Sequence, residues 1–159
     1  MAPLAEARYG LAVAVLDGKL YAVGGFNADE GILSSVERYD PATNAWEAVA
    51  PMAEARHSHA IAMLDGKLYA VGGYGGGVTL SSVERYDPAT NAWEAVAPMA
   101  TARGSHAVAV LDGKLYVVGG FCDDGYLSSV ERYDPATNAW EAVAPMASAR
   151  MDGFAVSLM

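Results

Sequence analysis

The chain has 159 residues, of which 53% are apolar and 18% charged, and its formal net charge is −9. This length fits one domain spanning residues 1–159, and the apolar share excludes a disordered chain. Ten basic residues against 19 acidic ones leave few cations for phosphate contacts, so we expect no nucleic-acid partner.

The sequence also bears on the compartment. No apolar run approaches the roughly 20 residues of a membrane span, and the first residues lack the basic region of a signal peptide. A single cysteine, Cys122, excludes an intramolecular disulfide and favours a reducing compartment. We therefore expect a cytoplasmic domain without membrane contact.

The first predicted elements form a hairpin. Residues 11–16 alternate small and large apolar side chains, which is typical of a strand, and the apolar run resumes at residues 20–23. Asp17-Gly18 lies between the two runs. A type I′ turn needs positive φ at both central residues, and Asp-Gly supplies it, so the pattern predicts an antiparallel hairpin.

Two further strands follow in the chain. Residues 35–39 combine β-branched and aromatic side chains, and residues 46–49 begin with Trp46. Between them, residues 40–44 contain proline, aspartate and asparagine, which favour a turn. The first unit is therefore predicted to contain four short antiparallel strands.

This unit is repeated. Residues 33–53 read LSSVERYDPATNAWEAVAPMA, and the same 21 residues recur at 80–100 and 127–147, an offset of 47 each time. We predict three blades of four strands, at about 8–53, 54–100 and 101–147, which is the organisation of a β-propeller. After them, residues 153–158 repeat the pattern of the first strand, which predicts an extra inner strand within 150–159.

The repeated residues resemble the kelch motif: a Gly-Gly pair after a strand, a variable loop, then Tyr, a turn and Trp. The resemblance covers essentially the whole chain and points to the propellers that serve as substrate-binding domains of BTB-kelch ubiquitin-ligase adaptors. It implies an all-β kelch propeller fold, a protein or peptide partner, no cofactor and no catalysis. Two departures from that family are the absence of a BTB or BACK region before the repeats, and three repeats in place of six.

Residues that recur in every unit are predicted to be structural. The Gly-Gly pairs would allow neighbouring strands to approach closely, the aromatic residues would pack one blade on the next, and the arginines would pair with a repeated carboxylate or a carbonyl. These residues are Gly24, Gly25, Gly72, Gly73, Gly119 and Gly120, the pairs Tyr39 and Trp46, Tyr86 and Trp93, Tyr133 and Trp140, and Arg8, Arg56 and Arg103.

Three blades are too few to close a ring, because propellers have about four to eight. Two copies joined head to tail would form a six-bladed ring, so we expect a homodimer. The extra strand within 150–159 duplicates residues 10–16, and either could occupy the junction. An alternative is an engineered or fragmentary origin, favoured by the identity of the 21-residue blocks, in which the chain is a self-assembling scaffold without a ligand.

Candidate binding residues lie where the repeats differ, in the loops after Gly-Gly and in the residues after the repeated arginine. Both stretches flank inner strands and are expected to face one mouth of the channel, where the resemblance places a ligand pocket. These loops contain no arginine to clamp an acidic peptide, so a basic or apolar ligand is favoured. The candidates are Tyr9, Phe26, Asn27, His57, Ser58, Tyr74, Thr79, Ser105, Phe121 and Asp123.

A metal site or an enzyme is a more distant alternative. His57, His59 and His106 could in principle supply three zinc ligands, but nothing in the sequence specifies the groups that would orient them. The prediction is therefore no metal and no catalytic residue.

Overall fold

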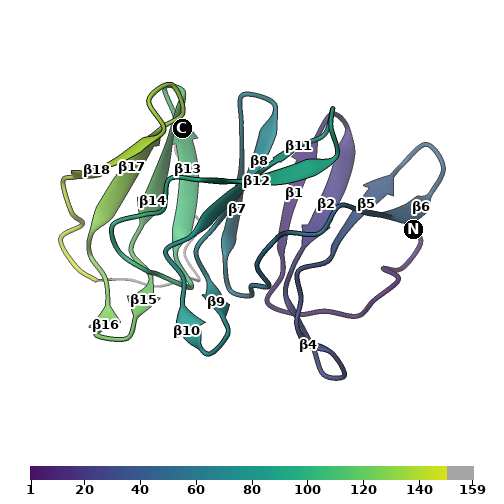
Figure 1. Cartoon of the computed structure of the whole chain (residues 1–159), viewed down its shortest axis with the longest axis horizontal. Helices are drawn as coiled ribbons and strands as arrows, with labels where there is room; N and C mark the ends of the chain where they lie inside the picture. The colour runs from purple at the N-terminus through teal and green to yellow at the C-terminus, as the bar shows by residue number, and fades with distance from the viewer. Residues whose placement is uncertain (150–159) are drawn as a thin grey trace.

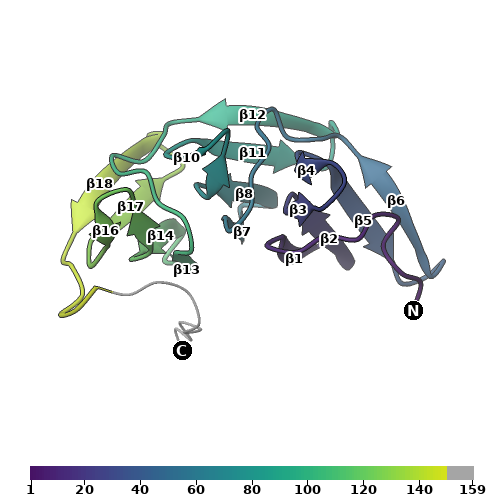
Figure 2. The ribbon, with the colours of Figure 1, turned by 90° about the horizontal axis from the view of Figure 1, so that it is seen from below.

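The computed structural model describes residues 1–149, and within them every regular element is a β-strand. Three four-stranded antiparallel sheets stand side by side along the chain (Figure 1). Seen from below, they form an open arc, with the first strand of each sheet on the concave side and the last on the convex side (Figure 2). The predicted all-β class and the three four-stranded blades are confirmed. The extra strand predicted within 150–159 lies outside the described residues.

Blade 1 shows the organisation that all three blades share. Its strands are β1 (Ala12–Leu16), β2 (Lys19–Val23), β5 (Val36–Asp40) and β6 (Ala45–Val49), hydrogen-bonded in the order β1-β2-β5-β6. Leu16 pairs with Lys19 at the tight turn, and Tyr39 pairs with Trp46 on the outer two strands.

Blades 2 and 3 repeat this order, and every strand again has five residues. Their strands are β7 (Ala60–Leu64), β8 (Lys67–Val71), β11 (Val83–Asp87), β12 (Ala92–Val96), β13 (Ala107–Leu111), β14 (Lys114–Val118), β17 (Val130–Asp134) and β18 (Ala139–Val143).

The turns have the geometry that their residues predict. Asp17 and Gly18 have φ of 50° and 72°, as the type I′ turn between β1 and β2 requires. At the turn between β5 and β6, Asn44 has φ of 51° and its Oδ1 accepts a hydrogen bond of 2.9 Å from the Tyr39 hydroxyl. Both turns lie at the same end of the blade.

The variable loops contain structure that was not predicted. Each folds into a hairpin of two-residue strands at the opposite end of its blade from the tight turns (Figure 1). Strands this short contain too few residues to show a period of two in the sequence. The hairpins are β3 (Phe26–Asn27) with β4 (Gly31–Ile32), β9 (Tyr74–Gly75) with β10 (Val78–Thr79), and β15 (Phe121–Cys122) with β16 (Gly125–Tyr126).

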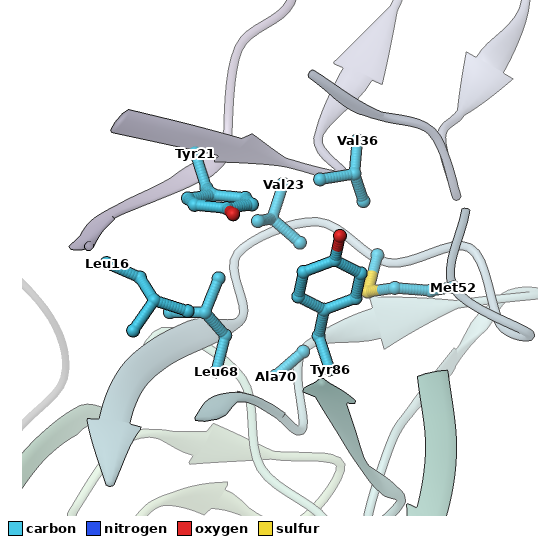
Figure 3. Packing of buried hydrophobic residues seen from close by; sticks show 8 residues of the cluster. All are labelled: Leu16, Tyr21, Val23, Val36, Met52, Leu68, Ala70 and Tyr86. Atoms are coloured by element: carbon cyan, nitrogen blue, oxygen red, sulfur yellow. The ribbon is translucent and has the colours of Figure 1, made fainter. Parts of the chain in front are cut away.

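The core lies between the blades. Tyr21 and Val23 of blade 1 pack on Leu68 and Tyr86 of blade 2, with Met52 of the connecting segment closing the cluster (Figure 3). A second cluster of equivalent residues joins blades 2 and 3. Because a single blade cannot bury its own apolar faces, each blade is stabilised by its neighbours.

The Gly-Gly pair allows the next blade to approach. The Gly73 amide donates a hydrogen bond of 2.8 Å to the Arg103 carbonyl, and its φ is 96°. A Cβ at Gly72 would lie 2.4 Å from the Arg103 carbonyl oxygen of blade 3, so only glycine fits at this point. The close approach is therefore to the backbone that leads into an inner strand.

Candidate functional site

The short hairpins and the entries of the inner strands lie together on one edge of the arc, at the opposite end of each blade from the tight turns. We call this edge the loop face. Here the structure brings together the two variable stretches that flank each inner strand, by one antiparallel backbone bridge in each blade. The bridged pairs are Tyr9 with Phe26, His57 with Tyr74, and Gly104 with Phe121.

Four rings run across blades 1 and 2 as a continuous row, which we call the aromatic row. The ring centroids are 5.1 Å apart for Tyr9 and Phe26, 6.4 Å for Phe26 and His57, and 5.5 Å for His57 and Tyr74. Tyr9 is 64% exposed, and the other three rings are half-buried. The row is therefore an apolar strip that solvent can reach.

The aromatic row ends over a glycine of blade 3. A Cβ at Gly104 would lie only 2.3 Å from Cε2 of Tyr74, so the Tyr74 ring rests where the other two blades have a side chain. Beyond it, Phe121 contacts the exposed Tyr126 ring at 5.6 Å. The absence of a side chain at Gly104 thus lets blade 2 extend its aromatic surface onto blade 3.

The two candidate serines form backbone hydrogen bonds between blades. The Ser58 amide donates to the Gly10 carbonyl and the Ser105 amide to the Ser58 carbonyl, both at 2.8 Å, which links the three blades in turn. Nδ1 of His57 lies 3.1 Å from Oγ of Ser58. Partial burial lowers the pKa of His57, which favours a neutral ring in the aromatic row.

The remaining candidates shape the hairpins. Asn27 donates to the Ala7 carbonyl at 3.1 Å and its Oδ1 accepts from the Asp29 amide at 2.7 Å, which holds the first loop in place. The Thr79 hydroxyl donates to Asp123 at 3.1 Å, across blades 2 and 3. Beside this contact lies a cleft of about 270 Å³, lined by Thr79, Thr101, Cys122, Asp123 and Asp124 among others.

The accessible charge in these hairpins is negative. Asp29, Glu30, Asp123 and Asp124 are exposed, and the sequences of the three hairpins contain no lysine or arginine. The neighbouring Glu6 carboxylate raises the pKa of Glu30, as expected where carboxylates crowd together. The loop face therefore combines an apolar strip with an acidic rim.

The repeated arginines next to the loop face are not available to a ligand. The Arg56 side chain is fully buried and donates to the Gly72 carbonyl at 2.8 Å, the Ser82 carbonyl at 3.1 Å and the Glu84 carboxylate at 2.9 Å. Arg8 and Arg103 make the equivalent contacts, with Glu37 and Glu131. The sequence predicted that each repeated arginine pairs with a carboxylate or a carbonyl, and in the structure each arginine binds both.

The repeated tryptophans lie at the junctions. Nε1 of Trp93 donates to the Ala50 carbonyl of the preceding connection, and Nε1 of Trp140 to that of Ala97, both at 2.8 Å. The rings of Trp93 and Trp140 pack against the two interblade cores. The paired tyrosines contact them at 5.2 Å for Tyr86–Trp93 and 5.1 Å for Tyr133–Trp140.

The three histidines considered as zinc ligands have different surroundings. His57 lies in the aromatic row, whereas His59 and His106 are buried beside the glycine pairs, near Gly24 and Gly72 respectively. Across residues 1–149, no three His, Cys, Asp or Glu side chains are grouped to hold a metal ion. Nor does that part of the chain contain a helix long and apolar enough to cross a membrane.

Three four-stranded blades with repeated Gly-Gly, Tyr and Trp positions define the chain as a part of a kelch-type propeller. A family model, the KLHDC2/KLHL20/DRC7 Kelch-repeats domain, matches residues 2–158. The chain belongs to this family, which confirms the resemblance seen in the sequence.

Similar proteins match over about one repeat. The Influenza virus NS1A-binding protein homolog of Mus musculus is 48% identical over 50 residues, which are 31% of this chain and 8% of that protein. Kelch-like protein 33 of Homo sapiens is 52% identical over 46 residues, or 29% of this chain and 8% of that protein. The Kelch repeat and BTB domain-containing protein 13 of Homo sapiens is 51% identical over 45 residues, or 28% and 10%. This chain thus matches at most a tenth of the length of these relatives.

A solved structure agrees over a longer stretch. The structure of YjhT matches with a TM-score of 0.80 at 21% identity, over 89% of this chain and 53% of that one. At this identity the match establishes the fold alone. The match spans about half of the YjhT chain, so that chain is nearly twice as long as the matched part.

Proposed function

We propose that the chain is a non-catalytic kelch-propeller module that binds a protein or peptide partner through the loop face, within a ring that two head-to-tail copies form. The aromatic row supports the binding role, because it places partly exposed rings where the repeats differ. Scaffold residues recur in all blades, whereas Tyr9, Phe26, His57 and Tyr74 do not form one repeated set. Aromatic residues are enriched at the energetic centres of protein interfaces.

The charge of the loop face favours a basic or apolar partner segment. Exposed carboxylates at Asp29, Glu30, Asp123 and Asp124 would repel an acidic peptide and attract lysine or arginine. An arginine or lysine side chain can also stack on an aromatic face. In this proposal the aromatic row supplies affinity and the acidic rim selects the sign of the ligand's charge.

A displayed peptide library panned against the purified protein tests the proposal. We expect hits rich in apolar and basic residues, with binding that weakens as salt is added. Replacing Tyr9 or Tyr74 by serine should weaken a hit about 10-fold or more, equivalent to about 1.4 kcal/mol for losing a buried aromatic contact.

Thr43→Ala is the matched control, because Thr43 lies in the exposed turn between β5 and β6, away from the loop face. It should bind the same peptides with unchanged affinity. A library without hits, or hits that bind the Tyr9 and Tyr74 variants as tightly as the parent, would contradict the proposal.

A further inference from the structure

Each junction between blades is made from the same two surfaces. We call forward face the side of a blade that packs on the next blade, which in blade 1 includes Leu16, Tyr21 and Val23 (Figure 3). The rear face is the side that receives the preceding blade, which in blade 2 includes Leu68 and Tyr86. Blade 2 uses both its faces, because its forward face packs on the rear face of blade 3.

Within residues 1–149, the forward face of blade 3 is packed against no further blade. Leu111 is 44% exposed, whereas its counterparts Leu16 and Leu64 are 2% and 4% exposed. Tyr116 and Val118 are half-buried, although the equivalent residues of blades 1 and 2 are buried. The side chains that form the core at two junctions thus meet solvent here.

The rear face of blade 1 is only partly covered by the described residues. Leu20 and Tyr39 are half-buried, whereas Leu68 and Tyr86 in blade 2 are completely buried at the same positions. Val13, on the adjoining inner strand, is 58% exposed. The two ends of the arc therefore carry the two complementary halves of one interface.

We infer that a second copy of this chain covers both faces: the forward face of blade 3 in each copy packs on the rear face of blade 1 in the other. This rests on the ring of the proposed function and assigns its junction. The same side chains already pack this way twice within one chain, so their complementarity is seen directly. Two such contacts related by a twofold axis leave no free end.

Specific contacts extend across the inferred junction. The tyrosine pairs Tyr21–Tyr86 and Tyr69–Tyr133 each have centroids 5.7 Å apart, and Tyr116 would make the third such pair with Tyr39 of the second copy. The backbone chain from Ser105 through Ser58 to Gly10 would continue, with the Ser105 carbonyl accepting from Gly10 of the second copy.

The N-terminal residues compete for this junction. Ala2 accepts a hydrogen bond of 2.9 Å from Nε1 of Trp46 and donates one of 2.9 Å to Asn44. At the junction of blades 1 and 2, Ala50 makes the same two contacts, with Trp93 and Asn91. Ala2 thus fills, within its own chain, a place that the connection of a preceding blade fills elsewhere.

In the ring, that place belongs to Ala144 of the second copy. Residues 144–146 continue directly from β18, and the Met146 amide donates a hydrogen bond of 2.8 Å to the Ser128 carbonyl, which holds them at the end of blade 3. Ala2 is held at blade 1 by its two hydrogen bonds to Trp46 and Asn44. Ring closure therefore displaces residues 2–4, and their presence weakens the association of the two copies.

Measuring mass against concentration, by light scattering or sedimentation without any peptide, tests the inference. The parent chain should approach twice its 16.6 kDa and stop there. Leu111→Glu should raise the dimer dissociation constant about 100-fold, because it places a charge in an apolar interface. Since Leu111 is exposed in the single chain, this variant should still fold.

Val110→Glu is the matched control, since Val110 is 39% exposed on the same strand but points to the other side of the sheet. It should keep the parent's dissociation constant. Deleting residues 2–4 should lower that constant about 10-fold, because the competing hydrogen bonds are gone.

Three results would overturn the inference: a parent and a deletion variant that both stay at 16.6 kDa, masses that grow beyond two copies, or equal dissociation constants for the Leu111 and Val110 variants. None of these depends on a ligand. Failure of the ring and failure of peptide binding at the loop face are therefore distinguishable.

Discussion

His59 and His106 are imidazoles buried next to the glycine pairs, at a place where blade 1 has Leu11. Burial, together with the nearby Arg56 guanidinium, lowers the pKa of His59 to about 3. Burial and Arg103 lower the pKa of His106 to about 3. In the folded chain both rings therefore stay neutral well below the pH at which a free histidine takes up a proton.

This difference makes stability depend on pH. The unfolded chain protonates its histidines near pH 6.5, so below that pH it binds more protons than the folded chain, and folding stability falls as the pH drops towards 3. Between pH 7 and pH 5 we expect a loss of up to about 2 kcal/mol for each of the two histidines. The double variant His59→Leu, His106→Leu copies Leu11 and should lose correspondingly less.

Urea unfolding at the two pH values measures the effect. His57→Leu is the control, because His57 is only half-buried and should leave most of the parent's pH dependence intact. If the double variant loses as much stability as the parent between pH 7 and pH 5, the buried histidines are not the cause.

From the sequence, the meeting of the two variable stretches was predicted, but the surroundings of several repeated residues were not. Comparing the repeats predicted that the stretches after Gly-Gly and after the arginine share one end, and the bridges Tyr9–Phe26 and His57–Tyr74 bring them together. The burial of His59 and His106 and the Glu84 partner of Arg56 were not predicted. The burial of the histidines depends on contacts between blades, and the Arg56–Glu84 pair joins residues far apart in one blade. The repeat pattern shows which residues recur without showing which of them meet.

The connection between blades is an element in its own right, held by one buried ion pair. Arg56 and Glu84 have side chains 0% and 5% exposed, and Glu84 also accepts from the Ala53 amide at 2.7 Å. Glu84→Gln should lower the free energy of unfolding by about 3 kcal/mol, because it removes the buried counter-ion of Arg56 and leaves only the partly exposed Glu54 carboxylate, 3.6 Å away. Glu94→Gln breaks the exposed pair with Arg85 and should cost less than about 1 kcal/mol.

Thermal or urea unfolding of the two variants gives the comparison. The test is whether Glu84→Gln loses more free energy of unfolding than Glu94→Gln, since each substitution removes one carboxylate charge from a pair with arginine. Equal losses of stability would show that burial of the connection does not set its strength.

Elements were predicted where local patterns are strong. Asp17-Gly18 fixes a hairpin by its own backbone preference, and the five-residue strands are long enough to show alternation. The hairpins β3–β4, β9–β10 and β15–β16 were missed, because their sequences differ and each strand has two residues. The ring of two copies stays a prediction, since a sequence shows how many blades a chain has and not what covers its ends.

At the scale of the whole molecule, the arc distributes burial unevenly. Blade 2 is covered on both faces, and in β8 the residues from Leu68 to Val71 are all buried. In β2 Leu20 is half-buried, and β14 has buried and half-buried residues in alternation. Because the stability of a repeat array is a sum over blades and their junctions, blade 2 should be the most stable part of a single chain.

Amide hydrogen exchange followed by NMR can test this by comparing two strands of identical sequence. Strands β2 and β8 have the same residues, Lys-Leu-Tyr-Ala-Val, between the same Asp-Gly and Gly-Gly pairs, so their intrinsic exchange rates are equal. In dilute solution we expect β8 to exchange at least about 10-fold more slowly than β2, because opening β8 breaks two junctions.

If two copies close the ring, β2 should approach the protection of β8 as concentration rises. In the Leu111→Glu variant the difference should persist at every concentration. Equal exchange of the two strands in that variant would show that the junctions do not set the stability of the blades.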